Sequence, residues 1–176
     1  MDYIHLKSPF LYREYGFTLI ELIVVIAVMG IMSAIVIPKL NNPEYKIKKA
    51  ARQMYGDMER VKMLAVKNNT KYRMRFDPNG YTIQDNAGNV FKTVNFNSAA
   101  QGVTYGSGNA TVTANSRPTA NLPADGVGYA KDLIFNPRGT CTGGYVYLEY
   151  RGISFALGTT TTGFVKFRRW TKGAWR

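Results

Sequence analysis

The chain has 176 residues, 45% of them hydrophobic, and its 23 Lys and Arg residues against 11 Asp and Glu residues give a formal net charge of +12. This length accommodates one extended helix and one modest globular domain. A single histidine, His5, and a single cysteine, Cys141, exclude a Ser-His or Cys-His pair and a His/Cys metal cluster from the body of the chain. We therefore expect no enzyme, no catalytic residues, no metal or other cofactor and no small-molecule substrate, with Cys141 buried as a small apolar side chain.

A long apolar run dominates the N-terminal part of the chain. From Phe17 to Ile37 the only ionisable side chain is Glu21. A helix of roughly 20 apolar residues can cross the hydrocarbon core of a bilayer, so the run predicts a membrane helix. A carboxylate in such a helix usually has a partner. From the residues alone, Glu21 is either solvated at the membrane interface or paired.

The start of this run, Gly16-Phe17-Thr18-Leu19-Ile20-Glu21-Leu22, resembles the prepilin signature of type IV pilins and type II secretion pseudopilins. The resemblance implies that a prepilin peptidase cuts between Gly16 and Phe17 and methylates the new amine of Phe17. It also implies that Glu21 meets the N-terminal amine of a neighbouring subunit and sets the register of a filament. One departure is Tyr15, which stands where family leaders usually carry a basic residue.

The same resemblance implies a location. It predicts a single-pass protein of the bacterial inner membrane, with its C-terminal domain in the periplasm and a place in a pilus or pseudopilus after assembly. The implied partners are the prepilin peptidase, other pilin or pseudopilin subunits and the inner membrane.

The apolar run is followed by an amphipathic pattern. Pro38 permits either a kinked continuous helix or a stop, and Pro43 permits a second interruption or a new helical start. The apolar positions beyond it recur at steps of three and four, which predicts one buried helix face. They are Ile47, Ala50, Ala51, Met54, Met58, Val61, Leu64 and Ala65. We expect this helix to end at Asn68-Asn69, completing one long helix in the first half of the chain.

Short strands separated by turns follow the helix. Residues 72–76 alternate apolar and basic side chains, and Asp77-Pro78-Asn79-Gly80 predicts a turn to a partner strand at residues 81–83. Further strands are predicted at 90–96, 133–135, 145–150, 153–157 and 163–168, with weak strands near 103–105 and 110–113 and a long loop around 115–129. The pattern predicts an α+β fold in which an antiparallel β-rich domain packs on the amphipathic helix.

The expected organisation has four parts: a leader at 1–16, a transmembrane and filament-core helix at 17–38, its amphipathic continuation at 39–69, and a β-rich domain with a basic tail at 70–176. Within the domain, the strand Leu133–Phe135 followed by Asn136-Pro137-Arg138-Gly139-Thr140, a hairpin and a basic last strand resembles the GspH/FimT subgroup of minor pilins and pseudopilins. That resemblance implies a two-sheet domain against the helix.

The C-terminal tail is rich in cations and aromatic rings. No acidic residue lies between Lys166 and Arg176, and both tryptophans of the chain fall there. Cations neutralise phosphates and aromatic faces stack on bases, so the tail is a candidate DNA-binding element, alongside subunit contact or plain solvation. The candidate residues are Lys166, Arg168, Arg169, Trp170, Lys172 and Arg176.

The FimT-like relatives include DNA-binding minor pilins with a basic C-terminal Gly-Arg-x-Arg motif. Here the nearest equivalent is Lys166-Phe167-Arg168-Arg169, which lacks the glycine directly before its first basic residue. The predicted function is a minor pilin or pseudopilin, assembled into or at the tip of a type IV pilus or a type II secretion pseudopilus. The alternatives are a DNA-binding minor pilin for DNA uptake through the tail, and a secretion pseudopilin that contacts protein substrates.

Overall fold

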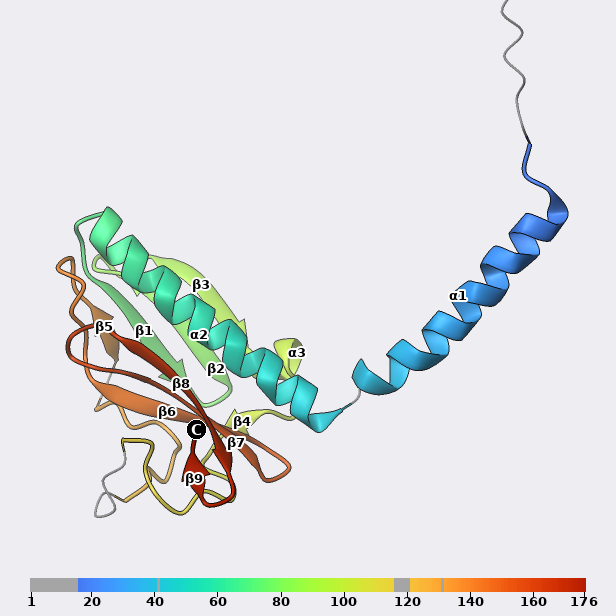
Figure 1. Cartoon of the computed structure of the whole chain (residues 1–176). Helices are drawn as coiled ribbons and strands as arrows, with labels where there is room; N and C mark the ends of the chain where they lie inside the picture. Colours follow the sequence, from blue (N-terminus) through green and yellow to red (C-terminus); the bar gives the residue numbers. More distant parts are fainter. Residues whose placement is uncertain (1–15, 41, 116–120, 131) are drawn as a thin grey trace, which may run out of the picture. The chain divides into compact units, whose positions relative to one another are not determined.

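A computed structural model describes residues 16–40, 42–115, 121–130 and 132–176. Most of the predicted leader therefore lies outside the described residues. The chain divides into two compact units, residues 1–39 and 40–176. Figure 1 shows a helix α1 in the first unit, and a helix α2 with two β-sheets in the second. An N-terminal helix followed by an antiparallel β-sheet domain confirms the predicted α+β class.

The first unit contains α1 (Leu19–Leu40). Its backbone remains helical through Pro38, so this proline does not end the helix. The apolar side chains between Leu19 and Met32 are half exposed or more. Within the described part of the chain, no helix meets the length and apolarity required for a membrane span.

The second unit begins with α2 (Pro43–Lys67), which has its own start signal. Asn42 adopts an extended conformation (φ −66°, ψ 126°), and its side chain accepts a hydrogen bond from the Glu44 N–H at 2.9 Å. Pro43 occupies the first turn, where its missing N–H costs no helical hydrogen bond. The first half of the chain therefore forms two helices rather than one long helix.

The predicted amphipathic face of α2 is confirmed. Its buried apolar residues are Ile47, Ala50, Ala51, Met54, Met58, Val61 and Ala65, and Leu64, also predicted for this face, is partly buried against the core. Asp57 is buried on the same face, which the sequence analysis did not anticipate. The helix ends at the predicted place, with Asn68 as its C-cap.

The first sheet has four antiparallel strands in the order β3-β2-β1-β5. Its strands are β1 (Tyr72–Asp77), β2 (Gly80–Asp85), β3 (Val90–Asn95) and β5 (Leu133–Phe135). The predicted hairpin of β1 and β2 is confirmed, with Met74 opposite Ile83. Residue 96, predicted to extend the third strand, instead begins the short helix α3 (Phe96–Ala99), which Asn95 caps through its side chain.

The second sheet has five strands in the order β4-β6-β7-β8-β9. They are β4 (Thr104–Tyr105), β6 (Gly144–Tyr150), β7 (Ile153–Thr159), β8 (Val165–Thr171) and β9 (Ala174–Trp175). The helix α2 contacts strands of both sheets (Figure 1). The main core is formed by buried residues of this helix and of the two sheets. Its largest members include Met54, Met58, Met74, Leu148 and Phe155.

The predicted weak strand at 110–113 is wrong, because this segment is a loop. One carbonyl in this segment and one directly after it accept hydrogen bonds from side chains of the second sheet. The Trp175 Nε1–H donates to the Val112 carbonyl at 2.7 Å, and Arg168 donates to the Ala114 carbonyl at 2.9 Å. These hydrogen bonds satisfy the two backbone carbonyls without pairing to another β-strand.

Candidate functional site

The N-terminal motif lies at the start of α1. Gly16 and Phe17 precede the helix and are exposed, and Phe17 keeps 90% of its surface open. No other part of the described chain comes within 4 Å of the position that a Cβ atom on Gly16 would occupy. The peptide bond between Gly16 and Phe17 therefore lies in an accessible segment outside the helix.

Thr18 and Glu21 form a capping box at this end of α1. The Thr18 N–H and hydroxyl each donate to Oε2 of Glu21 at 2.9 Å, and the Glu21 N–H donates to Oγ1 of Thr18 at 3.3 Å. This reciprocal pattern satisfies N–H groups that have no acceptor within the helix. The Glu21 carboxylate is thus bound to its own chain, although its side chain remains exposed.

The residues of the basic tail separate onto two faces of β8, because side chains of a strand alternate. Lys166 lies opposite Gly158 and Arg168 opposite Ala156, on one face. Arg169 lies opposite the buried Phe155, on the other. The structure therefore brings Lys166 and Arg168 together and places Arg169 apart from them.

The side chain of Arg169 in β8 forms an ion pair with a residue at the start of α2. Its Nη1 lies 2.6 Å from Oε1 of Glu44, and its guanidinium carbon lies 6.0 Å from the centre of the Phe155 ring. Both partners of the ion pair are more than a third exposed, so solvent screens much of its energy. Sequence reasoning assigned Arg169 to the candidate DNA-binding set, whereas its observed partners are within the domain.

The remaining tail residues belong to the β8–β9 hairpin. Trp170 and Trp175 lie opposite each other with ring centres 5.2 Å apart, and Trp175 also packs on Tyr147. Lys172 is exposed in the connecting turn. Arg176 is exposed as well, and its backbone exchanges two hydrogen bonds with that of Arg169.

Lys166 and Arg168 line a groove of about 630 Å³ on this face. Tyr145 of β6, Thr159 of β7 and Thr160, which directly follows β7, also line the groove. Burial raises the pKa of the Tyr145 hydroxyl, and the nearby Arg168 cation acts in the opposite direction. The groove thus combines two cations, an aromatic ring and hydroxyl groups.

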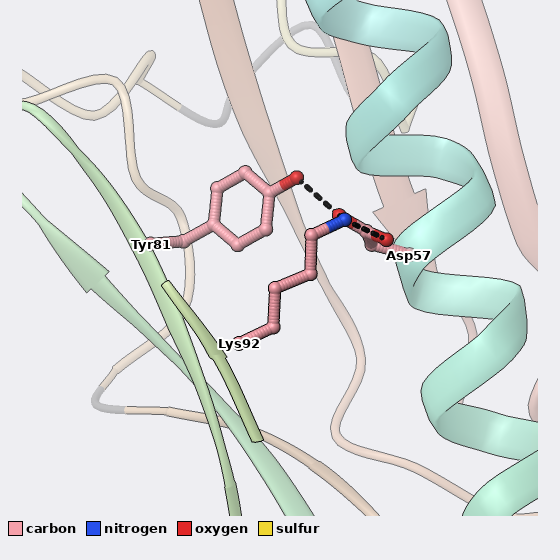
Figure 2. A network of polar contacts seen from close by, with 3 residues as sticks. All are labelled: Asp57, Tyr81 and Lys92. Atoms are coloured by element: carbon pink, nitrogen blue, oxygen red, sulfur yellow. Dashed lines mark hydrogen bonds and ion pairs between the residues drawn. The ribbon is translucent and has the colours of Figure 1, made fainter. Parts of the chain in front are cut away.

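A second polar cluster, which the sequence analysis missed, lies between α2 and the first sheet. Figure 2 shows Asp57 of α2 facing Tyr81 of β2 and Lys92 of β3. The Tyr81 hydroxyl donates to Oδ2 of Asp57 at 2.6 Å, and the Lys92 ammonium lies 2.7 Å from both carboxylate oxygens. Burial, followed by the Asp57 carboxylate, raises the pKa of Tyr81 well above its usual value. The sequence signal that could have revealed this cluster is an acidic residue, Asp57, within the apolar face of α2.

Cys141 is buried, with 5% of its surface exposed, as predicted. Its thiol donates to the Thr160 carbonyl at 3.1 Å, and burial raises its pKa. Across residues 16–40, 42–115, 121–130 and 132–176, no group of three or more His, Cys, Asp or Glu side chains is placed to hold a metal ion.

An accessible Gly16–Phe17 bond thus precedes a capped apolar helix, within the stretch that resembles the prepilin signature. Comparison with known families agrees, since residues 11–37 match the family described as "Prokaryotic N-terminal methylation motif". The motif indicates a type IV pilin-like protein that a prepilin peptidase processes, and it supports a pilin or pseudopilin family. No curated protein and no solved structure matched the chain.

Proposed function

We propose that the chain is a minor pilin or pseudopilin that is inserted in the bacterial inner membrane, cut between Gly16 and Phe17, and assembled into or at the tip of a filament. The single observation that carries this proposal is the match of residues 11–37 to the methylation motif. The exposed Gly16–Phe17 bond and the exposed apolar surface of α1 support it. In the proposed arrangement α1 contributes to the membrane anchor and the helical bundle, and the β domain is presented on the periplasmic side.

Glu21 has two roles in this proposal. Thr18 and Glu21 both lie after the cleavage point, so the capping box survives processing. The carboxylate then caps its own helix and meets the methylated amine of a neighbouring subunit. A charge pair in a low-dielectric bundle requires both members, because removing one leaves the other uncompensated.

The test is processing and incorporation of the full chain in bacterial membranes that contain a prepilin peptidase. Mass spectrometry is expected to find a mature chain that begins with N-methylated Phe17, and Gly16→Leu is expected to block cleavage. An uncut wild-type chain in the presence of an active peptidase would contradict the proposal.

Variants of Glu21 separate its two roles. Glu21→Gln keeps a side chain that can complete a capping box but removes the charge, whereas Glu21→Ala removes both. We expect both variants to be processed and neither to enter filaments. Incorporation of Glu21→Gln at the wild-type level would show that the carboxylate acts as a helix cap and not as a charge partner.

A second candidate function is nucleic-acid binding for DNA uptake. The observation that favours it is the groove that Lys166 and Arg168 share on one face of β8. The other alternative from the sequence is a secretion pseudopilin that contacts protein substrates. It becomes the preferred assignment if the chain is processed and assembled but binds no polyanion.

A further inference from the structure

The groove is built from three neighbouring strands. Tyr145 of β6 lies opposite Gly158 of β7, and Gly158 lies opposite Lys166 of β8. One step along the sheet, Ala156 of β7 lies opposite Arg168 of β8. Because residues in register share a face, the aromatic ring and the two cations occupy neighbouring positions on one side of the sheet.

Gly158 determines how the ring lies. A Cβ atom at this position would clash with Cδ1, Cε1 and Cγ of Tyr145, so the ring rests directly on the glycine backbone. Tyr147 supports it from the side, with ring centres 6.4 Å apart. The absence of a side chain on Gly158 therefore leaves room for the Tyr145 ring on the same face as Lys166.

The two cationic side chains differ in how the domain holds them. Arg168 is held by its bond to the Ala114 carbonyl, which uses one N–H group and leaves others for a ligand. The backbone of Lys166 pairs within the β7–β8 ladder, but its ammonium group makes no hydrogen bond or ion pair with any residue that the structure describes. No acidic side chain is among the described residues that line the groove. The electrostatic preference of the groove is therefore for an anion.

We propose that this groove binds single-stranded nucleic acid, with a base stacked on Tyr145 and the backbone phosphates contacted by Lys166 and Arg168. The proposal rests on the nucleic-acid candidate above and narrows it from the whole tail to one face of the sheet. Cationic grooves with aromatic platforms are the usual means of binding unpaired strands, because every base offers a face for stacking. In a duplex those faces are already occupied by neighbouring base pairs.

Size favours the same ligand. A volume of about 630 Å³ lies in the range of small-ligand pockets, roughly 300–1,000 Å³. Such a hollow admits a flexible strand that bends its bases inward. Arg169, which lies on the opposite face with Glu44, is not part of this site.

The experiment measures binding of the full chain, in a nonionic detergent, to a labelled oligonucleotide of about 16 nucleotides by fluorescence anisotropy. The same sequence as a duplex and a uronic-acid polysaccharide serve as the competing ligands. The variants are Tyr145→Leu, Tyr145→Phe and Lys166→Ala. Lys172→Ala is the matched control, since it removes the same charge from the exposed turn of the same hairpin.

We expect the single strand to bind more tightly than the duplex. Tyr145→Leu should weaken single-strand binding by roughly 5- to 150-fold, the range for loss of one stacked base. Tyr145→Phe should preserve it, and Lys166→Ala should reduce the dependence on salt more than Lys172→Ala does. Circular dichroism of each variant, matching the wild type, establishes that the domain is folded.

Three outcomes would overturn the proposal, and they can be told apart. Equal or tighter duplex binding that Tyr145→Leu does not change would retain nucleic-acid binding but eliminate the stacking groove. Equal losses for Lys166→Ala and Lys172→Ala would distribute the binding over the tail. Binding of the polysaccharide alone would overturn both this proposal and the nucleic-acid candidate, while leaving the filament role intact.

Discussion

Replacing Lys92 by methionine is expected to destabilise the domain by about 3–5 kcal/mol. The ammonium of Lys92 is the charge partner of Asp57, whose side chain is only 8% exposed. Without it, the carboxylate keeps one neutral hydrogen bond from Tyr81, and most of its desolvation cost is uncompensated. Methionine retains the apolar stem and removes only the charge.

Removal of the other partner is expected to cost less. Asp57→Ala leaves the buried Tyr81 hydroxyl without its acceptor, at about 1–3 kcal/mol. The Lys92 side chain is 33% exposed, so its ammonium can turn to water. The double variant Asp57→Leu with Lys92→Met leaves no buried charge and should be more stable than Lys92→Met alone.

The assay is urea unfolding of the full chain in detergent micelles, followed by the fluorescence of Trp170 and Trp175. Glu59→Gln is the control, because it removes a carboxylate from the same helix at a more exposed position. The reasoning is refuted if Lys92→Met lies within about 0.5 kcal/mol of the wild type, the usual range for a surface substitution.

Two further predictions concern close packing and buried hydroxyl groups. Gly163 and Gly173 both have positive φ, but a Cβ on Gly163 would clash with the Gly139 carbonyl, whereas Gly173 has open space. Gly163→Ala should therefore lower the urea midpoint clearly more than Gly173→Ala, and equal effects would contradict the clash. Burial raises the pKa of five tyrosines and most strongly that of three, so these three should stay protonated in the folded state, and stability should fall as pH rises above about 10, where tyrosines of the unfolded chain ionise. They are Tyr81, Tyr105 and Tyr129. Ultraviolet absorbance would detect this as a late ionisation step that coincides with unfolding, and full ionisation before unfolding would be inconsistent with it.

Much of the fold could be predicted from local patterns. The buried face of α2 repeats at helical spacing, and β1 alternates apolar and basic side chains, so each element carries its own signal. The helix start at Pro43 depends on a cap and a proline that are also local. The loop at 110–115 could not be predicted in this way, because its backbone is satisfied by Trp175, Arg168 and Tyr147 from distant strands.

The candidate sites also divide into those that a local sequence pattern predicts and those that depend on distant residues. Gly16, Phe17 and Glu21 lie within one short motif, so the sequence alone is enough to predict them as site residues. The tail was treated as one cluster because its cations are close in sequence. Because successive side chains of a strand point to opposite faces, the residue numbers alone predict that Arg169 lies on the other face from Lys166 and Arg168. Asp57 of α2 contacts residues of two strands that are distant in sequence, and no local pattern specifies those partners.

The ion pair of Glu44 with Arg169 has a mechanical consequence. Glu44 follows Pro43 at the start of α2, where the chain enters the domain, and Arg169 lies in the last long strand. A pulling force that arrives along the chain from α1 therefore meets, within its first helical turn, a cross-link to β8. Part of the load therefore passes directly to β8 until this solvent-screened ion pair breaks, and the packing of α2 in the core carries the rest.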